Sequence, residues 1–225
     1  MVIIFQDRRQ AGCALAHVIR DEVQEDLSAE NALVLGLPRG GVPVAFEVAC
    51  RLHLPLDVFV VRKLGVPGQE ELAMGAIASG GVVVMQDDVV RAYGIPPQTI
   101  DAVVARERAE IERREAAYRD GRPPVALCGR TVILVDDGLA TGSTMKAAAR
   151  ALRPLARRVL IAVPVAARST CHELRQEADQ LICLETPEPF HAVGEFYHNF
   201  GQIADAEVRD LLLRARGESH GPRAA

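Results

Sequence analysis

Residues 132–144 read Val-Ile-Leu-Val-Asp-Asp-Gly-Leu-Ala-Thr-Gly-Ser-Thr, and this stretch decides how the chain is interpreted. Four apolar residues predict a buried strand, which ends in the adjacent acids Asp136 and Asp137 and runs into a turn of small residues. Small side chains let backbone N–H groups approach an anion closely, and the N-terminus of a helix expected over 142–152 adds partial positive charge. The turn therefore predicts a phosphate-binding loop.

The two acids indicate what lies beside the phosphate. Ionised aspartates only accept hydrogen bonds, and sugar hydroxyls donate them. A phosphate next to a vicinal diol predicts ribose 5-phosphate. The alternative is that Asp136 and Asp137 only end a strand and the glycines only shape a turn, but α/β proteins bind ligands at the carboxyl ends of strands. A GxxxxGK[ST] loop does not fit, because Gly142 is followed by Ser143, and the GxGxxG fingerprint is absent.

Short apolar runs alternate with helical patterns along the chain, which favours a parallel α/β sheet. We expect a doubly wound, mainly parallel five-stranded sheet flanked by helices, with an inserted hairpin and helix and a small hood. The expected strands are 32–37, 57–61, 131–135, 158–165 and 180–184; the expected helices are 42–53, 95–119, 142–152, 169–178 and 205–215; the hairpin pairs 72–78 with 82–85.

The helix over 95–119 is rich in Arg and Glu, which predicts a solvated face rather than a ligand site. The residues assigned to that face are Glu107, Arg108, Glu110, Glu112, Arg113, Arg114 and Glu115. In domain terms we expect a single domain over 1–215 with its core at about 32–185. A hood would come from about 186–205 and possibly from 1–30, and 216–225 would be a disordered tail.

Composition narrows the class of protein. With 49% hydrophobic and 25% charged residues, the 225-residue chain resembles an ordinary globular protein, and its net charge of −4 gives no reason to expect nucleic acid as a partner. No stretch approaches the roughly 18 apolar residues of a membrane span. Five widely spaced cysteines without a CxxC pair, and no secretory segment, predict idle thiols and a cytoplasmic location.

The stretch 132–144 resembles the phosphoribosyl-pyrophosphate signature of the type I phosphoribosyltransferase family: four apolar residues, two acids, then a Thr/Gly-rich loop. The resemblance extends with lower specificity over 32–184. Gly138 stands where the family usually has an apolar residue, which predicts a more flexible start of the loop. The substrate-binding residues that the resemblance implies are Arg39, Gly40, Gly41, Lys63, Asp136, Asp137, Ala140, Thr141, Gly142, Ser143 and Thr144.

Arg39-Gly40-Gly41 follows the first expected strand, where the family places its pyrophosphate-binding loop. A doubly wound order would set this strand beside 131–135, so that both anion loops meet at one switch point. Taken alone, Arg-Gly-Gly is equally compatible with a plain turn. Lys63 lies at the end of the next expected strand, where similar enzymes have a basic residue that contacts pyrophosphate; the alternative is a solvated lysine.

The resemblance implies a catalytic set of Arg39, Lys63, Asp136 and Asp137, with Mg²⁺ held through the substrate and not directly by the protein. Arg39 and Lys63 would stabilise the leaving pyrophosphate, and the acids would orient the ribose. Segment 65–78 would supply a lid.

The acceptor is less defined by the resemblance. Ala140 stands where transferases for 6-oxopurines usually have an Asp, and Ala140-Thr141-Gly142 is more similar to the loop of adenine-type transferases. Phe190, Phe196 or Tyr197 of the hood could stack on a base, or could only pack the hood.

The resemblance implies transfer of 5-phosphoribosyl from phosphoribosyl pyrophosphate to a nitrogenous base. The alternative is a non-catalytic sensor of phosphoribosyl pyrophosphate or a nucleotide. A hydrolase is a third interpretation, but no residue stands out as its general base. A homodimer is expected because it is the commonest assembly.

Overall fold

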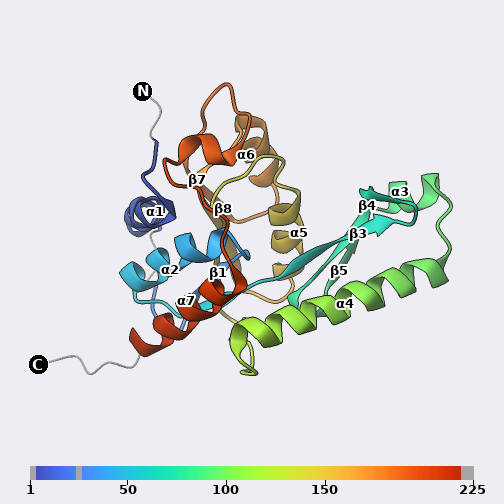
Figure 1. The fold of residues 1–225 in the computed structure, drawn as a ribbon, viewed down its shortest axis with the longest axis horizontal. Helices are drawn as coiled ribbons and strands as arrows, with labels where there is room; N and C mark the ends of the chain where they lie inside the picture. The colour runs from blue at the N-terminus through green and yellow to red at the C-terminus, as the bar shows by residue number, and fades with distance from the viewer. Residues whose placement is uncertain (1–3, 24–26, 219–225) are drawn as a thin grey trace, which may run out of the picture.

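The computed structural model describes residues 4–23 and 27–218, which build a central parallel sheet, its flanking helices and a projecting second sheet (Figure 1). All five strands of the central sheet are parallel, as predicted. In the order in which they lie, they are β2 (Leu56–Val58), β1 (Ala32–Gly36), β6 (Thr131–Val135), β7 (Arg158–Val165) and β8 (Gln180–Glu185).

Helices cover both faces of this sheet, as a doubly wound fold requires. Alternate residues of β1 and β6 point to opposite faces, so Val34 and Ile133 join one core while Leu33 and Val132 join the other. The first core is closed by α1 (Arg8–Glu22), α2 (Gly41–Leu52) and α7 (Asp205–Glu218), and the second by α5 (Ser143–Leu152) and α6 (Arg168–Leu174). Figure 1 shows these two groups on opposite sides of the sheet.

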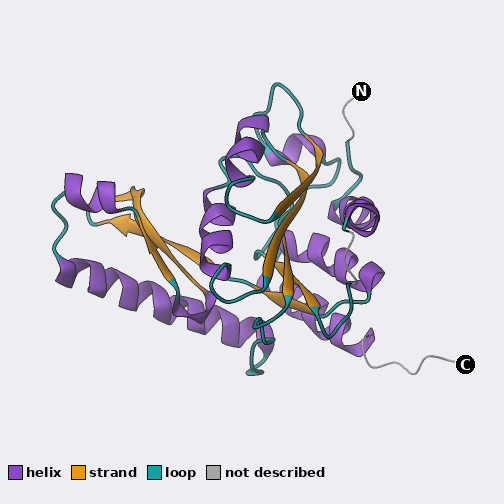
Figure 2. Ribbon diagram, turned by 180° about the vertical axis from the view of Figure 1, so that it is seen from behind, coloured by secondary structure: helices purple, strands orange, loops and turns teal. Residues whose placement is uncertain are grey.

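A second sheet, antiparallel and three-stranded, extends away from the central sheet together with two helices (Figures 1 and 2). We call this unit the arm (residues 61–119). It consists of β3 (Val61–Val66), β4 (Gln69–Ala78), β5 (Val83–Met85), α3 (Asp87–Ala92) and α4 (Pro97–Arg119). The predicted hairpin is confirmed as the pair β4–β5, but β3 is an additional strand of the same sheet.

The strand expected at 57–61 is wrong at its end, because the chain leaves the central sheet after Val58. The backbone N–H of Val60 donates to Ser79 Oγ, and the N–H of Ser79 donates to the carbonyl of Val60, both at 2.8 Å. Val61 then pairs with Ala78 as the first residue of β3. These two hydrogen bonds with Ser79, which follows β4, direct the chain from β2 of the central sheet to β3 of the arm.

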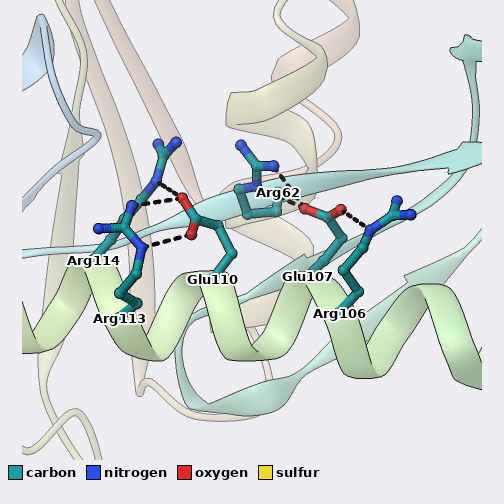
Figure 3. Close-up of polar contacts among 6 residues, drawn as sticks. All are labelled: Arg62, Arg106, Glu107, Glu110, Arg113 and Arg114. Atoms are coloured by element: carbon teal, nitrogen blue, oxygen red, sulfur yellow. Dashed lines mark hydrogen bonds and ion pairs between the residues drawn. The ribbon is translucent and has the colours of Figure 1, made fainter.

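The solvated face predicted for α4 is wrong at Glu107, which is buried and whose carboxylate lies between the guanidinium groups of Arg62 and Arg106 (Figure 3). Glu107 shares a stripe with Val103 and Ile111, four residues apart, and all three are buried. Arg62 Nη2 lies 2.7 Å from Glu107 Oε2, and Arg106 Nε lies 3.0 Å from Oε1. Burial raises the pKa of Glu107, but these hydrogen bonds outweigh it and hold the pKa below its ordinary value.

The prediction of a solvated face agrees better with Glu110, which is only partly buried. Its carboxylate accepts hydrogen bonds from Arg113 and Arg114 at the surface, at 2.8 and 2.7 Å, and these lower the pKa of Glu110 to about 2 (Figure 3).

A buried ion pair fastens the end of α4 to the central sheet. Arg119 Nε lies 2.9 Å from Asp57 Oδ1, and Arg119 Nη1 lies 2.8 Å from Glu115 Oε1. The carboxylate of Asp57 also accepts backbone hydrogen bonds from Val58 and Val125, at 2.8 and 3.0 Å. The base of the arm is thus held by charges that are satisfied inside the protein.

The chain start joins the segment near residue 200 beside the carboxyl edge of the sheet. We call residues 4–8 and 186–204 together the hood. The backbone N–H of Phe5 donates to the carbonyl of Phe196, and His198 N–H donates to the carbonyl of Phe5, both at 2.9 Å. From Arg8 onward the chain forms α1, which packs on α2. Helix α7 continues to Glu218, beyond the end expected at 215; the rest of the expected tail, 219–225, lies outside the described residues.

None of the helices in the described ranges combines the length and the apolar character needed to cross a bilayer. All five cysteines are free thiols.

Candidate functional site

The loop after β6 is fixed at its middle and open at its tip. Leu139 N–H donates to the carbonyl of Val165 at 2.9 Å, and Ala167 N–H donates to the carbonyl of Leu139 at 3.0 Å. The hydroxyl of Thr170 donates to the carbonyl of Ala140. The side chains beyond this anchor are exposed, namely those of Ala140, Thr141, Ser143 and Thr144.

The tip leads directly into α5, and its geometry suits an anion. Gly142 has a φ of 66°, and a side chain there would meet Thr170 Cγ2 at 2.5 Å. No side chain caps the N-terminus of α5. Its first N–H groups and the hydroxyls of Thr141 and Ser143, 3.3 Å apart, supply donors for phosphate oxygens.

Gly138 has a different role from the flexibility predicted for it. It is buried, and a Cβ there would lie 2.5 Å from Val193 Cγ1 and 2.9 Å from Val165 Cγ1. The glycine therefore lets the hood pack directly on the start of the loop.

The loop after β1 meets the acid pair, as the doubly wound order predicted. β1 pairs with β6 so that Gly36 lies opposite Val135. A Cβ at Gly40 would overlap the carboxylate of Asp137, and one at Gly41 would lie 2.7 Å from the carbonyl oxygen of Val135. The peptide bond between Pro38 and Arg39 is cis. The two glycines and the two acids thus share one point at the carboxyl edge of the sheet.

The side chain of Arg39 is directed to Asp205 and not to the acid pair. Its Nη1 is 3.8 Å from Asp205 Oδ1, and the side chain is 41% exposed. A long ion pair between exposed groups contributes little stability. Arg39 is therefore free to turn toward a bound anion at small energetic cost.

Lys63 reaches the loop from the arm and not from a strand of the parallel sheet, which corrects the prediction. It lies in β3, and its Nζ donates to the backbone carbonyl and the carboxylate of Glu71, both at 3.1 Å. Lys63 lines a cavity of about 820 Å³ between the arm and α5, together with Ser143 and Thr144. The structure thus brings it to the same loop from a different sheet.

Burial sets the electrostatics of the acid pair. It raises the pKa of Asp136 well above its ordinary value, and the neighbouring charge of Asp137 raises it further. Burial also raises the pKa of Asp137, although the guanidinium of Arg8 opposes this rise. Arg8 Nε lies 2.8 Å from Asp137 Oδ2. The pair therefore holds less negative charge than two exposed aspartates would.

Arg8 contacts the acid pair, although the sequence did not indicate this contact. It contacts Asp137 across 129 residues of chain, and the only local sign is the charged run Asp7-Arg8-Arg9. Tyr197 adds a second link from the hood, because its hydroxyl donates to the backbone carbonyl of Asp137 at 2.6 Å.

The hood aromatics pack mainly on one another. Phe196 and Tyr197 are buried, with Phe190 stacked 5.3 Å from Phe196 and Phe200 stacked 5.0 Å from Tyr197. Phe190 also lines a cavity of about 590 Å³ beyond the ends of β7 and β8. The other residues lining this cavity are Ala167, Arg168, Ser169, His172, Pro187 and Glu188.

Comparisons with known proteins agree with this geometry. The phosphoribosyl transferase domain matches residues 4–200. A candidate phosphoribosyl transferase of Mycobacterium tuberculosis is 48% identical over 213 residues, 94% of this chain. The match covers 47% of that relative, so the chain spans about half of its length.

Two further comparisons bear on the fold and the family. A crystal structure from Thermus thermophilus has a TM-score of 0.81 at 42% identity, covering 94% of this chain and 99% of that one. The bifunctional protein PyrR of Deinococcus deserti is 25% identical over 178 residues, 79% of this chain and 76% of PyrR. With the family match spanning most of its length, the chain belongs to the phosphoribosyl transferase family.

Proposed function

We propose that this chain is a Mg²⁺-dependent transferase that moves the 5-phosphoribosyl group from phosphoribosyl pyrophosphate to a nitrogenous base and releases pyrophosphate. The observation that carries the proposal is the contact of Gly40 and Gly41 with Asp137 and the end of β6. This contact supports the proposal because the loop after β1, the two acids and the loop after β6 then lie close enough together to serve the pyrophosphate, the ribose and the 5-phosphate of one ligand.

In this proposal each part of the donor has its own residues. The exposed tip from Ala140 to Thr144 holds the 5-phosphate, and Asp136 and Asp137 accept hydrogen bonds from the ribose hydroxyls. The backbone N–H of Gly40, together with Arg39, holds the pyrophosphate, and Gly41, whose N–H donates to the carbonyl of Leu37 at 3.0 Å, allows the close approach of the loop to the acid pair. Lys63 adds charge from the arm once it leaves Glu71, an exchange made easy by the exposure of both side chains.

The transfer breaks the bond between C1 of the ribose and the pyrophosphate oxygen and forms a bond from C1 to the acceptor nitrogen. The proton that this nitrogen loses is balanced by the protonation of the released pyrophosphate. The negative charge that develops on the pyrophosphate is stabilised by Arg39 and Lys63, and the acid pair favours the cationic sugar.

Magnesium would add charge neutralisation at the pyrophosphate oxygens. The residues present fit this ion, because Mg²⁺ favours substrate phosphates and retained waters over a protein cage. In the described part of the chain, no three acidic, histidine or cysteine side chains gather as a metal site. The two aspartates would orient the ribose hydroxyls, and Arg39 and Lys63 would share the neutralisation of the pyrophosphate charge with the ion.

We place the acceptor in the cavity lined by Phe190. Ala167, one of its lining residues, donates a hydrogen bond to the carbonyl of Leu139, so this cavity lies beside the loop that follows the acid pair. Phe190 offers a ring for stacking, and the ion pair of Arg168 with Glu188, at 2.9 Å, offers both donors and acceptors to a heterocycle.

Release of pyrophosphate from phosphoribosyl pyrophosphate, tested with a panel of purines, pyrimidines and pyridines, checks the proposal. At least one base should support turnover, and Phe190→Ala should raise the KM for that base about tenfold while the KM for the donor stays unchanged. Tyr93→Ala, which removes an exposed aromatic ring of the arm, is the control. Donor binding without turnover for any base would instead favour the sensor.

A further inference from the structure

We propose that Arg8 is a positioning residue for the reaction: it fixes the Asp137 carboxylate for the ribose and ties that carboxylate to the hood. The inference rests on the proposed function, because it assigns Arg8 through the aspartate that would bind the ribose.

The side chain of Arg8 is held in place by several contacts. The side chain is buried within the hood, and Nε lies 2.8 Å from Asp137 Oδ2 while Nη1 donates to the carbonyl of Gly201 at 2.8 Å. The guanidinium lies 3.9 Å from the ring centre of Phe200. Arg8 engages Asp137 at Oδ2, so this contact itself does not block a ribose hydroxyl at Oδ1.

Hydrogen bonds to the backbone on both sides of Arg8 fix its position at the start of α1. Arg8 is the first residue of α1, whose N-cap Asp7 accepts a hydrogen bond from the N–H of Gln10 at 2.8 Å. Three residues earlier, the backbone N–H and carbonyl of Phe5 are hydrogen-bonded to Phe196 and His198 in the 186–204 part of the hood. Arg8 therefore sits between two fixed segments, and a single guanidinium joins the hood to the acid pair.

Charge gives this support a chemical role besides a steric one. The groups that face Asp137 are the carboxyl of Asp136, the guanidinium of Arg8 and the phenol of Tyr197, while the nearby Arg39 is directed to Asp205. Burial raises the pKa of Asp137 and Arg8 counters it. Without Arg8 the carboxyl would stay protonated to a higher pH, and a protonated carboxyl is a poorer acceptor for ribose hydroxyls.

Removing Arg8 takes away a charge that lowers the pKa of Asp137, so the pKa of Asp137 rises. Binding that needs the ionised carboxylate is then weaker at the low end of the pH range and recovers as the pH rises. A residue that only packed the hood would weaken binding equally at every pH.

The test is calorimetric titration of phosphoribosyl pyrophosphate with Mg²⁺ into the full chain, from about pH 6 to about pH 9. The proteins are wild type, Arg8→Gln, Arg8→Lys and Arg9→Gln. Arg9 is the adjacent arginine of α1 and is exposed, which makes it the matched control. Thermal unfolding of each variant reports whether it folds, and Arg8→Met, which keeps the stem against Phe200, replaces Arg8→Gln if that variant does not.

We expect Arg8→Gln to bind about tenfold more weakly near pH 7 and to approach wild type at high pH. Arg8→Lys keeps the charge and should keep the pH dependence of wild type, and Arg9→Gln should match wild type throughout. Three outcomes would overturn the inference about Arg8 while leaving the proposed function intact. They are wild-type affinity in Arg8→Gln, a loss of affinity in Arg8→Gln that does not recover as the pH rises, and an Arg8→Lys variant whose binding depends on pH as that of Arg8→Gln does. A wild-type protein that binds no donor at any pH would overturn the proposed function, and this inference with it.

Discussion

Arg119→Ala is expected to lower the free energy of unfolding by about 3–5 kcal/mol, because it leaves the buried carboxylate of Asp57 without its charged partner. Arg119 and Asp57 are 6% and 1% exposed, so water cannot replace the lost guanidinium. Urea unfolding at neutral pH measures the loss. The arm should loosen from the central sheet at the same time, because Arg119 also donates to the carbonyl of Val58 at 3.1 Å.

Arg113→Ala is the control for Arg119→Ala. Arg113 lies on the same helix and also pairs with a glutamate, but its side chain is 65% exposed, and its loss should change the stability by about 0.5 kcal/mol or less. The double variant Asp57→Asn/Arg119→Met should recover part of the loss, because neither partner then leaves a buried charge. An Arg119→Ala variant as stable as wild type would contradict the role of this pair.

Gly41→Ala is expected to reduce donor binding about 100-fold or more. The added Cβ would lie 2.7 Å from the carbonyl oxygen of Val135 and 2.8 Å from Asp136 Cα, and both are backbone atoms that a side-chain rotation cannot move. The end of β6 would have to shift, and the acid pair would shift with it. Affinity for phosphoribosyl pyrophosphate, measured beside thermal unfolding, separates loss of the site from loss of the fold.

Gly217→Ala is the matched control for Gly41→Ala. Gly217 lies in α7, and apart from its chain neighbours and the backbone of its own helix, no heavy atom of the described residues lies within 4 Å of the position that its Cβ would take. This variant should bind as wild type does. Equal binding by Gly41→Ala and Gly217→Ala would show that the close approach at the end of β6 does not matter for the ligand.

The central sheet could be predicted because its strands are continuous apolar runs. β1 and β6 are buried at every residue, which is typical of parallel strands covered on both faces. The meeting of the Arg-Gly-Gly loop with the acid pair followed from the strand order of a doubly wound fold, and the structure confirms it. The roles of these residues toward a ligand stay predictions.

The arm was harder to predict, for a physical reason. The run from Leu56 to Val66 contains two short strands of different sheets, and the break between them depends on Ser79, which is distant in sequence. Glu107 looked like a surface residue because its neighbours in the sequence are charged. Its burial is made possible by Arg62, which comes from β3.

The contact of Arg8 with the acid pair could not be predicted for the same reason. This contact with Asp137 joins the start of the chain to the middle, and no local pattern requires it. Lys63 was expected at the end of a strand of the parallel sheet, but it lies in β3 of the arm. It lines one cavity with Ser143 and Thr144, and strand propensity does not reveal this packing of the arm sheet beside α5.

Calorimetric titration of phosphoribosyl pyrophosphate into the wild-type chain and into Asp136→Asn/Asp137→Asn, with and without Mg²⁺, tests the central claim most directly. Asp101→Asn, at an exposed position of α4, controls for the loss of an acid. We predict binding by wild type and Asp101→Asn that requires the metal and is lost in the double variant. Equal binding by the double variant, or no binding by wild type, would contradict the claim that the acid pair after β6 holds a phosphorylated ribose.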